Sequence, residues 1–197
     1  NLIKDLNFKK NVFAILKHNN PCGVAIRSKL VDAYKDSLSS DNISAFGGVL
    51  ITNSKIDFET ANEINKLFFE VLIAPSFEKD ALDLLKSKKN RIILELIKYP
   101  SNTNNYRSCL DGELRQSVDD IIDVSKNFNI VTKASPDKAI INDLVFASII
   151  SKHTKSNCII LVQDYKLIGS GMGQVSRIDA LNQAIEKSKK FGFKSKL

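Results

Sequence analysis

The stretch NVFAILKHNNPCG (residues 11–23) joins an apolar run to a lysine, to one of the chain's two histidines and to a Pro-Cys-Gly tripeptide. The run NVFAIL (11–16) predicts a buried strand, and we expect Pro-Cys-Gly to turn the chain directly after it. Lys17 and His18 then stand at the carboxyl end of a strand, where ligands bind in α/β folds. Histidine transfers protons near neutral pH, and an ammonium group stabilises negative charge on oxygen. The alternative is a surface histidine beside a solvated lysine.

Outward from this stretch, apolar runs alternate with amphipathic runs. Further strands are predicted over residues 47–53, 70–75, 91–96, 158–164 and 167–171, the last two joined as a hairpin. Helices are predicted over residues 29–38, 58–70, 77–89, 142–153 and 176–190. The alternation predicts an α/β fold in which mixed sheets are covered by helices. The polar stretch YPSNTNNYRS (99–108) is predicted to be a loop between approximate subdomains 1–105 and 106–197.

Length and composition suit one large or two small globular domains, since the chain has 197 residues of which 43% are hydrophobic. The net charge of +7 suits an anionic partner, but aromatic residues are not interleaved with the lysines, so nucleic-acid binding ranks last. Cys22, Cys109 and Cys158 lack CxxC spacing, which argues against zinc and favours a reducing compartment. Without an apolar run of roughly 20 residues or a signal peptide, we expect a cytoplasmic protein with no membrane contact.

A second candidate site is GSGMGQVSRID (169–179), in which three alternating glycines precede a predicted helix. Ser176 suits the helix N-cap, Asp179 stands at the capping-box position, and Arg177 lies in the first turn. Free N–H groups, the helix dipole and an arginine together favour an anion site, although a purely structural helix start is equally compatible. The segment matches neither G-x-G-x-x-G nor a P-loop. The expected apolar face of the helix consists of Ile178, Leu181 and Ile185.

Three further places could contact a ligand. In SAFGG (44–48), two glycines entering a strand let a ligand or another backbone approach, or simply form a tight bend. In HTKSNC (153–158), Asn157 could hydrogen-bond an amide or a heterocycle, or belong to a turn rich in side-chain hydrogen bonds. Glu70, at the start of an apolar strand, could accept hydrogen bonds from a ligand or be a solvated strand end.

Taken together, these segments resemble a known family. The stretches KHNNPCGVAI, SAFGGVLI, EVLIAPSFE, NDLVFASIISKHTKSN and IGSGMGQVSRIDA follow one another in this order. The series closely resembles the AICAR transformylase domain of the bifunctional purine-biosynthesis enzyme, which also carries IMP cyclohydrolase. The resemblance covers nearly the whole chain. Its most specific parts are Lys-His-x-x-Pro-x-Gly (17–23) and G-x-G-x-G-Q-x-S-R (169–177).

The resemblance implies a reaction and an architecture. A formyl group passes from the co-substrate 10-formyltetrahydrofolate to the 5-amino group of AICAR, giving formyl-AICAR in purine (IMP) biosynthesis. The implied fold consists of cytidine-deaminase-like α/β subdomains without the zinc of that relative, and the implied assembly is a homodimer with active sites shared between subunits. A deaminase would need a metal-activated water and a ligand set of His and Cys, for which the sequence offers no matching pattern.

The resemblance also implies roles for individual residues. His18 matches the proton acceptor and Lys17 the group that stabilises the transition state. Removal of a proton during attack helps a weakly nucleophilic aromatic amine, and an ammonium can stabilise the oxyanion of formyl transfer. A folate-contacting position is matched by Ile178. The positions that match AICAR contacts or lie beside them are Gly47, Phe46, Glu70, Asn157 and Arg177, with Asn157 expected to reach the partner subunit's site.

The family pattern extends beyond this chain on both sides. The cyclohydrolase domain, an Arg-Tyr pair that helps to bind AICAR and later folate-binding segments have no counterpart here, so we expect residues 1–197 to be the central part of a transformylase domain. Two other classes of function stay open. One is a nucleotide-binding fragment without catalysis, and the other is a basic RNA-binding domain with steeply salt-dependent affinity.

Overall fold

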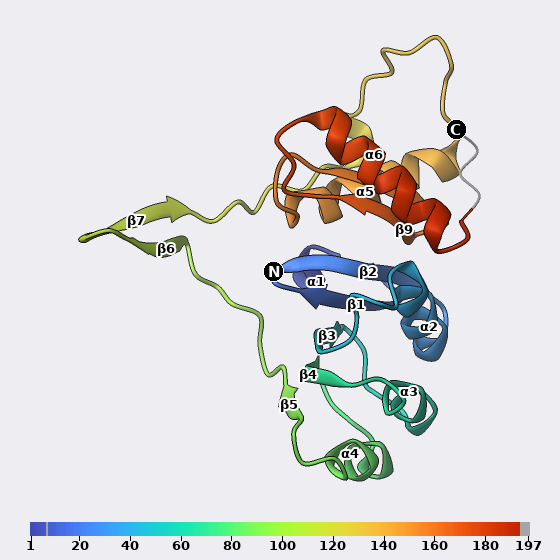
Figure 1. Ribbon diagram of the computed structural model, residues 1–197, viewed down its shortest axis with the longest axis vertical. Helices are drawn as coiled ribbons and strands as arrows, with labels where there is room; N and C mark the ends of the chain where they lie inside the picture. Colours follow the sequence, from blue (N-terminus) through green and yellow to red (C-terminus); the bar gives the residue numbers. More distant parts are fainter. Residues whose placement is uncertain (7, 194–197) are drawn as a thin grey trace.

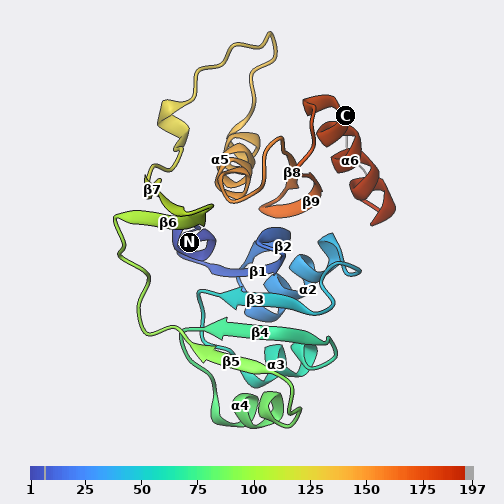
Figure 2. The same cartoon turned by 60° about the vertical axis from the view of Figure 1, so that its left-hand side comes forward.

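The computed structural model describes residues 1–6 and 8–193, and its centre is a mixed seven-stranded sheet (Figure 1). The strands lie in the order β5-β4-β3-β1-β2-β9-β8, which Figure 2 shows from below to above. Their bounds are β1 Asn11–Lys17, β2 Asn20–Arg27, β3 Gly48–Thr52, β4 Phe69–Ala74, β5 Ile92–Glu95, β8 Ile159–Gln163 and β9 Lys166–Gly171. The predicted α/β class with helix-covered sheets is confirmed.

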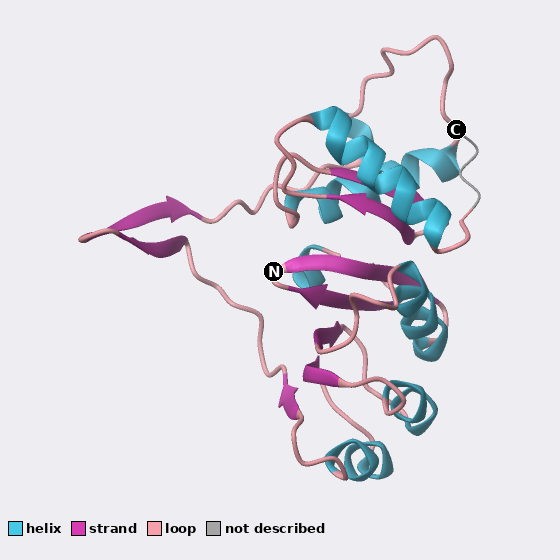
Figure 3. Ribbon diagram, viewed as in Figure 1, coloured by secondary structure: helices cyan, strands magenta, loops and turns pink. Residues whose placement is uncertain are grey.

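Helices cover both faces of this sheet (Figure 3). Along β1, Phe13 and Ile15 pack into a core with α2, α3 and α4, whereas Val12 and Ala14 pack into a second core with α1 and α5. This alternation is what a strand buried on both faces requires. The helices are α1 Leu2–Asp5, α2 Leu30–Ser40, α3 Phe58–Ile64, α4 Lys79–Lys86, α5 Lys138–Lys152 and α6 Arg177–Lys190, with a short 3-10 turn at Ser125–Asn127.

Strand directions bring distant segments to one end of the sheet. Strands β3, β4 and β5 are mutually parallel, whereas β1 is antiparallel to both β2 and β3, and β9 is antiparallel to both β2 and β8. The turn between β1 and β2 therefore lies at the same end as the starts of β3, β4 and β8 and the end of β9. Most candidate site residues precede or follow strands at this end.

The prediction that Pro-Cys-Gly turns the chain is wrong. The chain reverses before this tripeptide, at His18 and Asn19, where φ is 51° and 63°, and Lys17 pairs with Asn20 across the turn. Pro21, Cys22 and Gly23 belong to β2, a strand that the sequence pattern did not reveal. Proline is tolerated there because the register between β1 and β2 shifts beside it, at a position where a ladder N–H can be missing.

The segment predicted as the loop 99–108 is partly a strand. Strand β6 (Asn104–Cys109) pairs with β7 (Gly112–Ser117) in a hairpin that projects from the body of the molecule (Figure 1). All residues of β7 are exposed, so the hairpin buries no hydrophobic face of the kind that strand prediction detects. The helix predicted over 58–70 is also shorter than expected, because α3 ends at Ile64 and β4 begins at Phe69.

Helix α6 buries a different face from the predicted one. Its buried residues are Ala180, Ala184 and Ser188, whereas Ile178 is 65% exposed. A Cβ atom on Gly171 would lie 1.8 Å from the carbonyl oxygen of Ala180, so the helix packs directly on the glycine backbone of β9. A Cβ atom on Gly169 would likewise lie 2.4 Å from the carbonyl oxygen of Ala184. These two glycines therefore serve close helix–strand packing, which is the structural role that the sequence left open beside an anion site.

Candidate active site

A cavity of about 490 Å³ opens beside the turn between β1 and β2. Its volume falls within the range of roughly 300–1,000 Å³ that is typical of small-molecule sites. The residues come from the end of β1, the loop before β3, and the starts of β3 and β4, which the sheet topology brings together. The lining consists of Leu16, Lys17, His18, Asn19, Gly47, Val49 and Glu70. We call Lys17, His18, Gly47 and Glu70 the turn cluster.

Lys17 is held in place by two backbone carbonyl groups. Its Nζ donates to the carbonyl oxygen of Phe46 at 2.5 Å and to that of Gly47 at 3.1 Å. An ammonium group has three N–H donors, so these bonds leave one donor for a ligand in the cavity. The side chain thus carries a positioned positive charge that could meet a developing oxyanion.

Gly47 makes this arrangement possible. Its φ of +64° lies in the left-handed region, and a Cβ atom on it would lie 3.1 Å from Lys17 Nζ. The Gly47 N–H donates to the carbonyl oxygen of Phe68 at 2.9 Å, which fixes the loop against the start of β4. Glycine is the residue that adopts this backbone without strain. Its role here is to orient a backbone carbonyl towards the lysine.

His18 and Glu70 complete the turn cluster. His18 is exposed, and its carbonyl oxygen accepts a hydrogen bond from Asn20 Nδ2 at 3.2 Å. Along β4, Phe69 is buried and Glu70 is exposed, as strand alternation requires. The cavity wall therefore combines an ammonium, an imidazole and a carboxylate. This set can bind a polar ligand and move a proton.

Phe46 lies at the margin of this cluster. Its carbonyl oxygen binds Lys17, but its side chain is 61% exposed and is not part of the cavity lining. The ring packs against Phe68 with a centroid distance of 5.1 Å. Phe68 falls within residues 58–70, which the sequence predicts to be a helix, so it is not among the predicted site residues.

Asn157, Arg177 and Ile178 belong to a separate group, which we call the loop cluster (residues 154–157 and 172–178). Asn157 Nδ2 donates to the carbonyl oxygens of Gln174 at 3.0 Å and Val175 at 3.1 Å. These three predicted site residues do not line the 490 Å³ cavity. The structure thus divides the candidate site residues between two clusters at the same end of the sheet.

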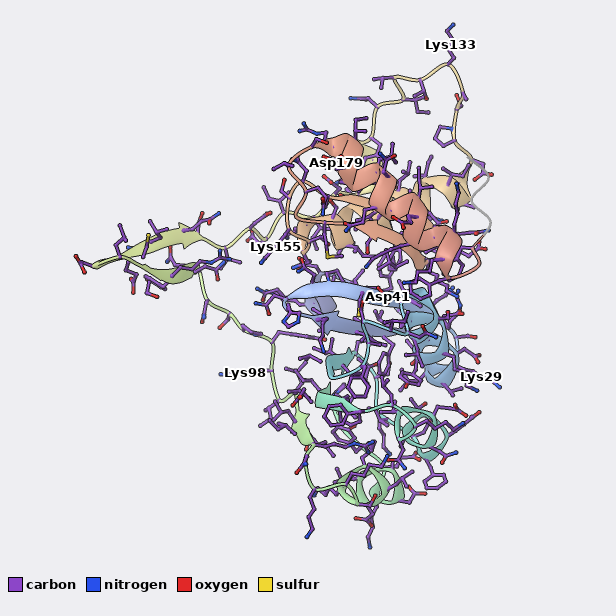
Figure 4. The ribbon with its side chains drawn as sticks, viewed as in Figure 1. Lys29, Asp41, Lys98, Lys133, Lys155 and Asp179 are labelled. Atoms are coloured by element: carbon purple, nitrogen blue, oxygen red, sulfur yellow. The ribbon has the colours of Figure 1, made fainter. Side chains whose placement is uncertain are left out.

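The start of α6 follows the predicted capping pattern. Ser176 is the N-cap, and its Oγ accepts a hydrogen bond from the N–H of Asp179 at 3.0 Å. Arg177 is the first residue of the helix and is exposed. Figure 4 labels Asp179 at this end of α6. The first helical turn and Arg177 are both accessible to an anion.

The second histidine, His153, connects two helices through a carboxylate. His153 Nε2 and Lys152 Nζ each lie 2.9 Å from Asp5 Oδ2, which joins the end of α5 to α1. Burial lowers the pKa of His153, against the opposing effect of its hydrogen bond to Asp5. At Asp5, burial favours the neutral acid, but hydrogen bonds from Lys152 and His153 outweigh it and lower the pKa. In the segment HTKSNC (153–158), Asn157 is therefore the remaining candidate for ligand binding, and it belongs to the loop cluster.

Within residues 1–6 and 8–193, no group of three or more His, Cys, Asp or Glu side chains is arranged to hold a metal ion. No helix in this part of the chain is both long and apolar enough to cross a lipid bilayer.

Comparison with known proteins identifies the family. The model of the AICARFT/IMPCHase bienzyme family matches residues 1–187. The chain belongs to this bienzyme family. A similar protein from Bacteroides thetaiotaomicron, named bifunctional purine biosynthesis protein PurH, is 50% identical over 181 residues, which cover 92% of this chain and 36% of that protein. A protein of the same name from Aquifex aeolicus is 39% identical over 184 residues, covering 93% of this chain and 36% of its own length.

Membership of the AICARFT/IMPCHase family links the chain to purine biosynthesis. The chain spans about a third of the length of the curated relatives that it matches. Sequence reasoning overlooked Asn20, Phe68 and Lys155, whose contacts support the two clusters. Asn20 stands in the stretch KHNNPCG, but its one hydrogen bond to a loop far along the chain leaves no local pattern.

Proposed function

We propose that this chain contributes to AICAR formyl transfer, in which 10-formyltetrahydrofolate donates a formyl group to the 5-amino group of AICAR. The observation that carries the proposal is the turn cluster, since Lys17, His18, Gly47 and Glu70 line one cavity. The family of the chain and the purine-biosynthesis names of its relatives point the same way. We therefore assign the formyltransferase part of the bienzyme to these residues.

His18 is the proposed proton acceptor. An aromatic amine next to a carboxamide is a weak nucleophile, because its lone pair is delocalised into the ring. An imidazole that removes the amine proton during attack on the formyl carbon lowers the activation barrier. Such general-base catalysis typically raises the rate by about 10²–10⁴-fold. The exposed position of His18 on the cavity wall suits contact with such an amine.

Lys17 is the proposed stabiliser of the transition state. Attack on the formyl group places negative charge on its oxygen, which then needs a positioned donor. Two N–H groups of the ammonium are occupied by the carbonyls of Phe46 and Gly47, and the third is the donor that we assign to the formyl oxygen. Glu70 is proposed to accept hydrogen bonds from AICAR, and Phe46 to pack beside it.

The loop cluster is proposed to bind the charged part of the nucleotide and the folate. Arg177 and the N–H groups at the start of α6 suit a phosphate, and Asn157 suits a hydrogen bond to the nucleotide. Ile178, which is 65% exposed, offers an apolar contact to the folate. Asn157 would act in the site of a partner subunit if the protein forms the expected homodimer.

A homodimer in the cytoplasm is the proposed state of the protein. The hairpin of β6 and β7 projects from the body and exposes Tyr106, Leu110 and Leu114, which a second copy of the chain could cover (Figure 1). The three cysteines are free, as is usual in a reducing compartment.

Calorimetric titration of AICAR tests the proposal. We would titrate this chain and a chimera in which it replaces the matching segment of the Bacteroides thetaiotaomicron relative. We expect both to bind AICAR, with Arg177→Ala weakening binding by about ten- to hundredfold, the scale of a lost charge-assisted hydrogen bond. Lys189→Ala, which removes an exposed positive charge from the other end of α6, is the control and should bind normally.

The outcomes separate the functions still open. Binding by the chain together with formyl transfer by the chimera supports the full proposal. Binding without transfer in the chimera favours a nucleotide-binding segment that lacks catalysis, which the separation of the two clusters would explain. If neither protein binds AICAR, the formyltransferase assignment is wrong.

A further inference from the structure

Asn20 forms hydrogen bonds in two directions. It is the first residue of β2 and pairs with Lys17 across the two-residue turn. Its Nδ2 donates to the carbonyl oxygen of His18 at 3.2 Å, and its Oδ1 accepts from the backbone N–H of Lys155 at 3.2 Å. One amide side chain thus connects the turn that carries His18 to a segment 135 residues away.

The far end of this connection is the loop cluster. The carbonyl oxygen of Lys155 accepts a hydrogen bond from the N–H of Gly173 at 2.8 Å. Asn157 and Gln174 exchange backbone hydrogen bonds at 3.2 and 3.3 Å. Lys155 therefore belongs to a bonded pair of loops that leads directly to Ser176 and the start of α6. Figure 4 shows Lys155 where this part of the molecule meets the strands β1 and β2.

The backbone pairing between β2 and β9 lies at the opposite end of β2. Their register is defined by one pair, Ala25 with Lys166, and the N–H of Ile26 donates to the carbonyl oxygen of Tyr165. The side chain of Arg27 donates to the carbonyl oxygen of Asp164 at that same end. Within residues 1–6 and 8–193, the bond from Asn20 to Lys155 is the one hydrogen bond that joins residues 17–20 to the loop cluster.

We propose that Asn20 is a positioning residue that sets the turn cluster and the loop cluster at a fixed separation. This inference rests on the proposed function, in which both clusters contact the same reaction partners. Reacting groups must be held in a narrow geometry for efficient transfer, and small displacements reduce the rate strongly. Asn20 acts through His18 and Lys155 and contacts no substrate itself.

The chemistry of the amide explains why asparagine serves here. A carboxamide offers an N–H₂ donor and a carbonyl acceptor on one short side chain. The carbonyl of His18 needs a donor, and the N–H of Lys155 needs an acceptor, so the two partners determine the orientation of the amide. Aspartate at position 20 would keep the acceptor for Lys155 but lose the donor to His18. Alanine would lose both.

The test compares Asn20→Ala and Asn20→Asp with Asn53→Ala. Asn53 is a matched control, because its Oδ1 accepts from the N–H of Val12 at 2.8 Å and its Nδ2 donates to the carbonyl oxygen of Lys10 at 3.0 Å. It thus bridges two backbone groups as Asn20 does, but at the other end of β1. Both alanine variants should lose similar stability in urea unfolding, which separates positioning from a general structural effect.

Amide hydrogen exchange of the ligand-free chain measures the connection directly. We expect the N–H of Lys155 to exchange about tenfold faster in Asn20→Ala, the loss of one typical hydrogen bond. Asn20→Asp should retain most of the protection, and Asn53→Ala should not change it. Unchanged exchange of Lys155 in Asn20→Ala would overturn the proposal, whatever the outcome with AICAR.

Kinetics of the chimera then test the consequence for the reaction. Asn20→Ala should lower kcat/KM for AICAR by about tenfold or more, Asn20→Asp should be intermediate, and Asn53→Ala should match the unmodified chimera. Equal losses in Asn20→Ala and Asn53→Ala would reduce Asn20 to a structural residue. If the unmodified chimera does not bind AICAR, the proposed function fails together with the positioning role, while the exchange data still decide whether the connection exists.

Discussion

Two hairpins in this protein share one turn geometry and differ in how the turn is surrounded. The strands β1 and β2 are joined by His18 and Asn19, with φ of 51° and 63°, and β8 and β9 by Asp164 and Tyr165, with φ of 50° and 55°. Two consecutive positive φ values match the twist of the flanking strands in two-residue hairpins. The sequence of neither turn contains the glycine that usually accompanies this geometry.

The turn between β8 and β9 is tightly anchored. The N–H groups of Asp164 and Tyr165 each donate to the carboxylate of Asp143 on α5, both at 2.8 Å. The Tyr165 ring packs edge-on against Phe8 and Phe146, with centroid distances of 5.8 and 6.0 Å. This turn therefore contributes to the hydrophobic core shared by α1 and α5.

The turn between β1 and β2 is exposed at both residues. The carbonyl of His18 accepts from the side chain of Asn20, and both turn residues line the 490 Å³ cavity. The comparison shows that the same turn conformation serves two purposes. In one hairpin the turn residues stabilise the fold, and in the other they present side chains to a cavity.

The largest expected effect is on catalysis at the exposed turn. His18→Asn removes the imidazole but keeps a residue type that tolerates positive φ. In the chimera, formyl transfer should fall by about 10²–10⁴-fold, the usual contribution of a general base. The urea midpoint should stay the same, because no core contact is lost. Retained formyl transfer would remove His18 from the proposed mechanism, and the exposed turn would then have no catalytic purpose that distinguishes it from the anchored one.

A matched glycine pair tests stability at the two turns. Tyr165→Gly removes ring contacts from the core and should destabilise the chain by about 2–3 kcal/mol. Asn19→Gly, at the same turn position of the other hairpin, should change stability by less than about 0.5 kcal/mol, since both residues accept positive φ. Chemical denaturation of both variants makes the measurement. Equal losses would show that the exposed turn is as important for folding as the anchored one.

The smallest expected effect is the pH dependence of stability that arises from His153, at the end of α5, and its partner Asp5 on α1. Because burial lowers the pKa of His153 below its ordinary 6.5, the unfolded chain binds this proton more readily, and stability falls as pH drops below about 6.5. The lowered pKa of Asp5 adds a further loss at more acidic pH, below its ordinary 3.8. Urea midpoints between pH 7.5 and about 5 should therefore fall for the unmodified chain.

His153→Gln provides the control for this pH dependence. The variant keeps a polar side chain near Asp5 but cannot take up a proton, so its urea midpoint should depend less on pH over the same interval. Parallel curves for the two proteins would show that the acid sensitivity arises elsewhere.

Local sequence features predicted much of the fold. The apolar runs of β1, β3, β4 and β8, the hairpin turn after residue 163 and the Ser176 cap of α6 are all present in the structure. Each depends on residues that are close in sequence, so periodicity and turn chemistry were sufficient. Strand β2 was missed because Pro21, Cys22 and Gly23 look like a turn when the pairing with β1 is unknown.

The candidate site was predicted only in part. The motifs pointed to Lys17, His18, Gly47 and Glu70, and the structure brings these four to one cavity. Their separation from Arg177 had no counterpart in the sequence, whereas the family resemblance already implied that Asn157 acts in the partner subunit's site. The sequence left an anion site and a purely structural helix start equally open for the three alternating glycines, and the packing of α6 on Gly169 and Gly171 of β9 had no local signal because it depends on tertiary contacts.

The sequence by itself determined the α/β class, the positions of most strands and helices and the family, because these depend on local periodicity and on residues in a recognisable order. The tertiary structure alone decided that β2 lies beside β9 and that Asn20 reaches Lys155 across 135 residues. Strand order and long-range hydrogen bonds depend on how distant segments bury their surfaces together, and a single chain carries no local pattern for that choice.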